Sequence, residues 1–239
     1  MAPDSPIIVA LDLPGNEALA LASALRGRVR WLKVGMTLFY AEGPGVVSAL
    51  KDLGFDVFLD LKLHDIPHQV EGAAAAITRL GVGMFTVHAS GGLAMMRAAV
   101  ESSRRVADES GVSAPAVLAV TVLTSTDDEQ LTEIGVRATA AEQVARLAGL
   151  ALDAEADGLV CSPIEAAEVR RLVGDDAFIV TPGVRPAWAE PGDQARISTP
   201  RAALEAGASH LVIGRPITAA ADPTAAVDRI LDEIEGMHR

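Results

Sequence analysis

The chain has 239 residues, half of them hydrophobic, and a formal net charge of −12 at pH 7. Such an acidic chain argues against nucleic acid or an anionic membrane as a partner, because both attract basic proteins. No apolar stretch is long enough to cross a bilayer, and the first residues lack the basic region of a signal peptide. The only cysteine, Cys161, cannot form an intrachain disulfide, so we expect a reducing compartment, the cytoplasm.

Short apolar segments alternate with segments of helical pattern along the chain. Strands are predicted at residues 7–11, 31–35, 55–60, 84–87, 116–122, 158–160, 178–180 and 211–213. Helices are predicted at residues 16–25 with Asn16 as cap, 46–53, 67–81, 91–106, 127–134, 140–152, 163–172, 200–205 and 223–234. This alternation implies parallel βαβ units, and eight of them predict an α/β fold, a (β/α)8 TIM barrel forming a single domain over residues 1–239. An open doubly wound sheet is the alternative, disfavoured because residues 12–15 contain no glycine-rich fingerprint.

One predicted strand ends in three charged residues, Asp60, Lys62 and Asp65. Residues two apart on a strand project from the same face, so we expect Asp60 and Lys62 side by side, with Asp65 beyond the strand. Charges at the end of an apolar strand are costly to place there. From spacing alone, a structural ion pair at a barrel rim explains them as well as a catalytic group does.

The positions of the other polar residues favour the catalytic interpretation. Only three residues are lysines, and two of them, Lys33 and Lys62, lie at strand ends among carboxylates. An ammonium group can release a proton there, whereas a guanidinium group cannot. In a barrel the carboxyl ends of the strands meet at one mouth. Those ends carry Asp12, Lys33, Asp60, Lys62, His88, Thr124, Arg185 and Arg215.

The loops after the last two predicted strands, residues 181–186 and 213–216, each combine a glycine with an arginine. These loops often form the phosphate site of a barrel, where glycine permits close backbone approach and arginine forks onto the phosphate. Gln194 and Arg196 lie in the loop between them. Either arginine alone is more simply a solvated surface charge, but the pair, Arg185 and Arg215, favours a phosphate site.

Taken together, these motifs resemble the orotidine 5'-monophosphate decarboxylase family. The resemblance rests on Asp-Leu-Lys-Leu-His-Asp-Ile-Pro at residues 60–67, Thr-Pro-Gly-Val-Arg-Pro at 181–186, Asp193-Gln194 and Gly214-Arg215, and it covers essentially the whole chain. The first motif alone is shared with other phosphosugar enzymes of the superfamily. The resemblance implies decarboxylation of orotidine 5'-monophosphate to uridine 5'-monophosphate in pyrimidine synthesis. It also implies no metal or organic cofactor, and a homodimer with active sites at its interface.

The resemblance further implies catalytic roles. Lys62 matches the proton donor, and Asp60 the carboxylate beside the scissile group. Asp65 matches the aspartate that reaches into the partner subunit's site, and Lys33 the lysine that orders the charges and meets the ribose. His88 is interpreted as a structural or supporting residue.

Substrate-binding residues follow from the same resemblance. Asp12 matches a ribose ligand, and Thr124 a position near the pyrimidine. The family commonly has Asn-Thr after Ile66-Pro67, where this chain has His68-Gln69. Ile66 and Gln69 are therefore expected at the substrate across the interface, with Gln69 in place of the usual threonine. The phosphate ligands are Arg185, Gln194, Gly214 and Arg215.

The implied reaction leaves a carbanion in the plane of the pyrimidine ring, without a cofactor to accept electrons, so the protein must supply fixed charge. Lys62 would stabilise and then protonate that carbon, while Asp60 and Asp65 keep the lysine charged. Two alternatives stay open. One is a Mg-dependent sugar-phosphate decarboxylase or aldolase of the same superfamily, and the other a non-catalytic nucleotide-binding barrel.

Overall fold

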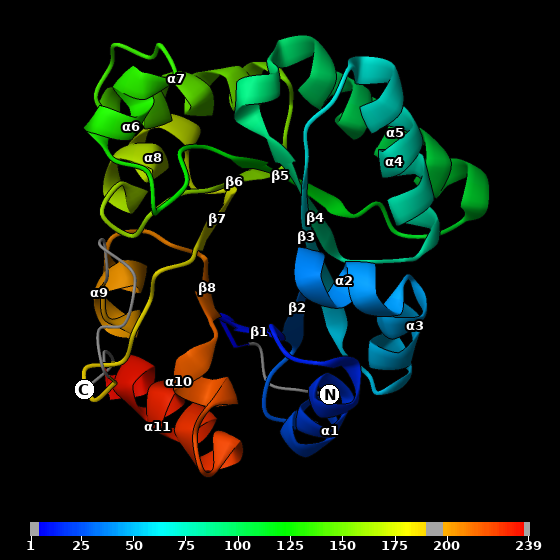
Figure 1. Cartoon of the computed structure of the whole chain (residues 1–239), viewed down its shortest axis with the longest axis vertical. Helices are drawn as coiled ribbons and strands as arrows, with labels where there is room; N and C mark the ends of the chain where they lie inside the picture. Colours follow the sequence, from blue (N-terminus) through cyan, green and yellow to red (C-terminus); the bar gives the residue numbers. More distant parts are fainter. Residues whose placement is uncertain (1–4, 190–197, 237–239) are drawn as a thin grey trace.

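The computed structural model describes residues 5–189 and 198–236. Its strands close into a parallel barrel in which each strand pairs with its neighbours in sequence and β8 pairs with β1 (Figure 1). The (β/α)8 barrel is therefore confirmed, and the open doubly wound sheet is not formed. The strands are β1 (Ile7–Ala10), β2 (Trp31–Gly35), β3 (Asp56–Leu63), β4 (Met84–His88), β5 (Ala116–Val120), β6 (Gly158–Val160), β7 (Phe178–Thr181) and β8 (His210–Ile213).

The helices form an outer ring around the strands (Figure 1). Within the described residues, none is both long and apolar enough to cross a membrane. The helices are α1 (Gly15–Leu25), α2 (Met36–Glu42), α3 (Gly45–Asp52), α4 (Pro67–Arg79), the 3-10 helix η1 (Ala89–Gly91), α5 (Leu93–Ser110), α6 (Asp128–Glu133), α7 (Ala140–Asp153), α8 (Ala166–Val173), α9 (Pro200–Glu205), α10 (Arg215–Thr218) and α11 (Pro223–Glu235).

The predicted start of the first helix was wrong, and one helix was not predicted. Asn16 does not cap α1, which begins at Gly15 after Pro14 and has no side-chain cap. Helix α2 was not predicted, because only Leu38 of its residues is buried while Tyr40 is 74% exposed. A helix that leaves apolar residues in solvent lacks the amphipathic pattern from which helices are recognised.

The barrel interior holds an apolar cluster below the polar mouth. Ile8, Trp31, Phe58, Met84, Leu118 and Val180 make up its buried core. Because strand side chains alternate between faces, the residue two positions further along each strand also faces inward. That residue is Lys33 after Trp31, and Asp60 after Phe58. The apolar cluster thus forms the floor on which the charged groups are placed.

Strand β3 continues through the charged motif instead of ending at Asp60 as predicted. Leu59 pairs with Phe85 and Leu63 with Val87, so four steps along β3 oppose two along β4. Lys62 lies inside this bulge with a φ of +54°, a left-handed conformation that costs a non-glycine residue about 1–2 kcal/mol. The bulge sets the direction of the Lys62 side chain, and simple strand alternation does not describe it.

Candidate functional site

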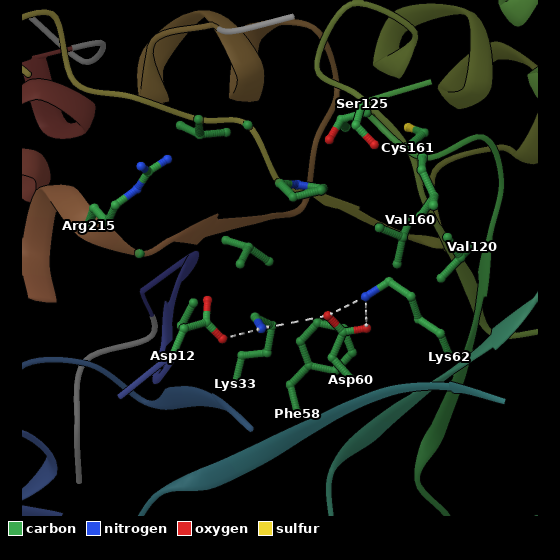
Figure 2. Close-up of a pocket in the computed structure, with 18 of the residues that line it drawn as sticks. Asp12, Lys33, Phe58, Asp60, Lys62, Val120, Ser125, Val160, Cys161 and Arg215 are labelled. Atoms are coloured by element: carbon green, nitrogen blue, oxygen red, sulfur yellow. Dashed lines mark hydrogen bonds and ion pairs between the residues drawn. The ribbon is translucent and has the colours of Figure 1, made fainter. Parts of the chain in front are cut away.

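Four charged side chains of alternating sign form a row at the mouth of the barrel (Figure 2). Lys62 Nζ donates to both Asp60 oxygens at 2.9 Å. Lys33 Nζ lies 3.7 Å from Asp60 Oδ2 and 3.3 Å from Asp12 Oδ1. The side chains of Lys33, Asp60 and Lys62 are 10%, 13% and 25% exposed, and that of Asp12 is 64% exposed. The predicted proximity of Asp60 and Lys62 is confirmed, and the row Asp12–Lys33–Asp60–Lys62 is called the charge array below.

Asp60 is ionised despite its burial. Burial alone would raise the pKa of its carboxyl group, but the nearby Lys33 and Lys62 ammonium groups and hydrogen bonds from Lys62 and Thr86 outweigh that effect and lower the pKa below its ordinary value. The array therefore keeps a negative charge between two positive ones at neutral pH.

Thr86 on β4 is a member of the site that our reading of the sequence missed. Its side chain is fully buried, and its hydroxyl group donates to Asp60 Oδ1 at 3.0 Å. The Thr86 hydroxyl oxygen, Oγ1, also accepts a hydrogen bond from the backbone N–H of Lys62 at 2.9 Å. The signal for it is the strand alternation described above, because Thr86 follows the inward-facing Met84 by two residues.

The charge array lines one wall of a cavity of about 540 Å³. Figure 2 shows Arg215 beyond the Asp12 end of the array and Lys62 at the other end, with Phe58 below and Val120 and Val160 beside Lys62. The lining comes from the carboxyl ends of every strand except β4. It consists of Ala10, Asp12, Lys33, Phe58, Asp60, Lys62, Val120, Val122, Leu123, Thr124, Ser125, Val160, Cys161, Pro182, Gly183, Val184, Arg185, Val212, Gly214, Arg215 and Pro216.

Most of the residues proposed from the sequence thus meet in one cavity. Three of them, Asp65, Ile66 and Gln69, do not line it; Asp65 and Ile66 are exposed between β3 and α4, and Gln69 is exposed in the first turn of α4. Asp65 Oδ1 accepts the backbone N–H of Ile66 at 2.6 Å. Gln194 and Arg196 lie outside the described residues, so the predicted place of Gln194 beside the phosphate stays a prediction.

His88 does not line the cavity. Its ring centroid is 5.4 Å from that of His64. Burial, followed by the charges of His64 and Lys62, lowers the pKa of His88 below its ordinary value, against the opposing effect of Asp60. A neutral His88 ring that is not part of the cavity lining fits the interpretation of this residue as a supporting one.

The residues that the structure describes contain no group of three or more His, Cys, Asp or Glu side chains able to hold a metal ion. Burial, with a smaller effect of the Glu165 carboxylate, raises the pKa of Cys161 to about 12, so this thiol at the edge of the cavity stays protonated. Among the described residues, the Asp, Glu, Lys and Arg side chains that line the cavity are those of the charge array, Arg185 and Arg215.

The fold and the cavity together define a (β/α)8 barrel with a charged pocket at its carboxyl-terminal mouth, the position and composition typical of enzymes that act on small anionic molecules. A family model described as "Orotidine 5'-phosphate decarboxylase / HUMPS family" matches residues 5–230. The chain belongs to this family.

Named relatives agree with this assignment along nearly the whole chain. The orotidine 5'-phosphate decarboxylase of Paramagnetospirillum magneticum is 49% identical over 231 residues, which cover 96% of this chain and 98% of that protein. The enzyme of the same name from Moorella thermoacetica is 52% identical, covering 96% of this chain and 92% of that protein. The crystal structure of orotidine 5'-phosphate decarboxylase from Lactobacillus acidophilus superposes with a TM-score of 0.83 at 42% identity, covering 97% of this chain and 99% of that one.

Proposed function

We propose that this protein is a carboxy-lyase that converts orotidine 5'-monophosphate to uridine 5'-monophosphate in pyrimidine synthesis. The observation that carries the proposal is the ammonium group of Lys62, held by two 2.9 Å contacts to Asp60 in the cavity of a chain about half identical to enzymes of this name. We also propose that residues 1–239 act as one domain in the cytoplasm. The closure of all eight strands into one barrel supports the single domain.

The order of groups along the cavity suggests how the nucleotide lies in it. The phosphate would bind Arg185, Gln194, Gly214 and Arg215, and the ribose would meet Asp12 and Lys33. The pyrimidine would then lie against the apolar lining near Thr124, with its C6 carboxylate toward Lys62. Lys62 is one end of the array and Arg215 lies beyond the other, which suits a ligand whose phosphate and reacting carbon are far apart (Figure 2).

The chemical step breaks the bond between C6 and the carboxylate carbon. CO2 departs, the electron pair stays on C6, and the Lys62 ammonium group protonates that carbon and is later recharged from solvent. Asp60 keeps the lysine charged and fixed, since a carboxylate of lowered pKa stays ionised beside it. Prearranged charge of this kind stabilises the developing anion without having to reorient during the reaction.

We further propose a homodimer in which Asp65, Ile66 and Gln69 of one subunit complete the site of the other. Their exposure, with Ile66 63% exposed before α4 and Gln69 exposed in its first turn, supports this role. In a twofold dimer each site would combine Lys62 of one chain with Asp65 of the second. Lys62→Ala and Asp65→Asn subunits should then complement each other when they are mixed.

The mixing experiment has a defined expected yield. Random exchange makes half of the dimers mixed, and each mixed dimer has one intact site, so activity should rise to about a quarter of the wild-type value when each variant alone is inactive. Sedimentation should show dimers in all samples. No recovery after confirmed exchange would contradict the shared site.

Release of CO2 from carboxyl-labelled orotidine 5'-monophosphate tests the main proposal. Lys62→Ala should fold normally and lose nearly all turnover, whereas Lys51→Ala, a matched change at an exposed lysine in α3, should retain it. Substantial activity in Lys62→Ala would refute the proton-donor role. EDTA should leave the rate unchanged; inhibition that added Mg²⁺ reverses would favour the sugar-phosphate alternative, and no CO2 release from wild type would favour a non-catalytic barrel.

A further inference from the structure

Thr86 joins Asp60 and Lys62, the two charged residues of β3 whose relative position the proposed reaction requires. It is fully buried on β4 and contacts both Asp60 and Lys62 of β3. We propose that Thr86 is a positioning residue, whose hydroxyl group holds the Asp60 carboxylate and the Lys62 backbone in the arrangement that decarboxylation requires. This inference rests on the proposed function.

The direction of both hydrogen bonds follows from chemistry. The backbone N–H of Lys62 can only donate, so Thr86 Oγ1 accepts that bond. An ionised carboxylate can only accept, so the single hydroxyl proton of Thr86 points at Asp60 Oδ1. The threonine therefore uses its donor for one partner and a lone pair for the other, and it is oriented by both.

The bond to the backbone maintains an unfavourable conformation. Lys62 adopts a φ of +54° in the β3 bulge, where its N–H meets the hydroxyl group at 2.9 Å. Without that acceptor the partly buried N–H would lose its partner, and Lys62 would be free to leave its left-handed conformation. Relaxation would turn the Lys62 side chain, because the direction of a side chain follows its backbone conformation.

The bond to Asp60 fixes the carboxylate between its two cations. Thr86 contacts Oδ1, Lys33 approaches Oδ2 at 3.7 Å, and Lys62 contacts both oxygens. A hydrogen bond to the ionised form also favours that form. Rotation of the carboxylate would lengthen at least one of these contacts, so the threonine fixes the carboxylate plane as well as its charge.

Two substitutions distinguish the effect of the Thr86 hydroxyl group from the effect of the side-chain shape. Thr86→Val keeps the branched shape and removes the hydroxyl, while Thr86→Ser keeps the hydroxyl. Thr78→Val is the matched control, because Thr78 is fully buried and its hydroxyl donates to the carbonyl of Ala74 at 2.9 Å within α4, away from the array. We would measure kcat and KM for each variant, and the titration of the Asp60 carboxyl by carbon NMR, assigned with Asp60→Asn.

We expect Thr86→Val to lower kcat by roughly 10²-fold, as for loss of one preorganised hydrogen bond, with a much smaller change in KM. The pKa of Asp60 should rise in this variant. Thr86→Ser should recover most of the lost kcat and the wild-type titration, and Thr78→Val should retain wild-type kcat.

Several outcomes would overturn the role of Thr86. They are a kcat for Thr86→Val within threefold of wild type, a loss confined to KM, or serine acting no better than valine. If the valine variant does not fold, Thr86→Cys replaces it, because a thiol is a weak donor; a kcat equal to that of the serine variant would then refute the proposal. If wild type releases no CO2, the proposed function fails, while an Asp60 titration unchanged by Thr86→Val would separately refute the hydrogen-bonding role.

Discussion

Replacing Asp60 with asparagine would remove one negative charge from the array with almost no change in volume. In the native chain Lys62 Nζ lies 2.9 Å from Asp60 Oδ1, and Lys33 Nζ lies 3.7 Å from Oδ2. Asp60→Asn leaves these two ammonium groups facing a neutral amide. We predict that the variant loses stability and at least about 10³-fold in kcat, because Lys62 is no longer held by an opposite charge.

The loss of stability can be estimated from the distances. At an effective dielectric constant of about 20, the attraction to Asp60 is roughly 6 kcal/mol for Lys62 and roughly 4.5 kcal/mol for Lys33. Desolvation of the three groups offsets most of this, and breaking a buried pair costs about 3–5 kcal/mol in free energy of unfolding. Lys62 is 25% exposed and can recover some hydration, so we expect about 3 kcal/mol. For a chain of this length, that lowers Tm by about 6–12 °C.

The pH dependence of the unfolding free energy tests whether the charge of Asp60 causes this loss of stability. The folded-state pKa of Asp60 lies below the ordinary value of 3.8, so its stabilisation is complete above the unfolded-state pKa and is lost as pH falls through the folded-state value. The gap in unfolding free energy between wild type and Asp60→Asn should therefore be full at pH 7 and shrink below about pH 4. Urea unfolding followed by fluorescence measures it.

A control on the same strand makes this prediction refutable. Asp56 lies 2.5 Å from Arg30 in an exposed pair, and Asp56→Asn should cost less than about 1 kcal/mol. Equal effects of Asp56→Asn and Asp60→Asn at pH 7, or a gap for Asp60→Asn that stays constant down to pH 3, would refute the assigned role of Asp60.

The remaining predictions concern other parts of the cavity. A Cβ at Gly35 would lie 3.0 Å from Lys33 Nζ and 3.1 Å from Asp12 Oδ1, so Gly35→Ala should displace that pair and raise KM roughly tenfold with little loss of stability. Arg215→Ala should raise KM by roughly 10²-fold through loss of a charge-assisted contact to phosphate. Because burial raises the pKa of Cys161 to about 12, iodoacetamide at pH 8 should label the unfolded chain and spare the native one.

Each of these has a contradicting result. An unchanged KM for Gly35→Ala would mean that the Lys33–Asp12 contact does not serve binding. For Arg215→Ala the control is Arg26→Ala at the carboxyl end of α1, and equal KM values for the two variants would move the phosphate elsewhere. Native labelling of Cys161 as fast as that of the unfolded chain would show that the thiol is accessible.

The barrel could be predicted because its strands are short apolar runs in a regular alternation, a pattern that depends only on local sequence. Helix α9 was predicted with its observed bounds, since Pro200 marks its first turn. Helix α2 was missed because Met36 and Tyr40 are apolar but exposed, so its sequence does not show the separate apolar and polar faces from which a helix is recognised.

The residues of the site likewise divide into those that the sequence predicts and those that it does not. Asp60, Lys62 and Lys33 could be proposed because charge at the end of an apolar strand is visible in the sequence. Thr86 could not be proposed by that route, because its importance comes from a contact between β3 and β4 across a bulge. The register between strands is a property of the folded barrel. A bulge changes that register, and the residues that form it carry no recognisable signal in the sequence.

The alternation of charge in the array explains how an acidic chain can present a cation to an anionic ligand. Asp60 already engages Lys62 through two contacts, so it stabilises the ammonium form and fixes its position before any ligand arrives. The same carboxylate would repel a substrate carboxylate placed beside it, and that repulsion must be offset by binding elsewhere in the cavity. Arg215, which lies beyond the Asp12 end of the array, can supply that binding (Figure 2). A phosphate bound at Arg215, as proposed, would add binding energy without neutralising Lys62.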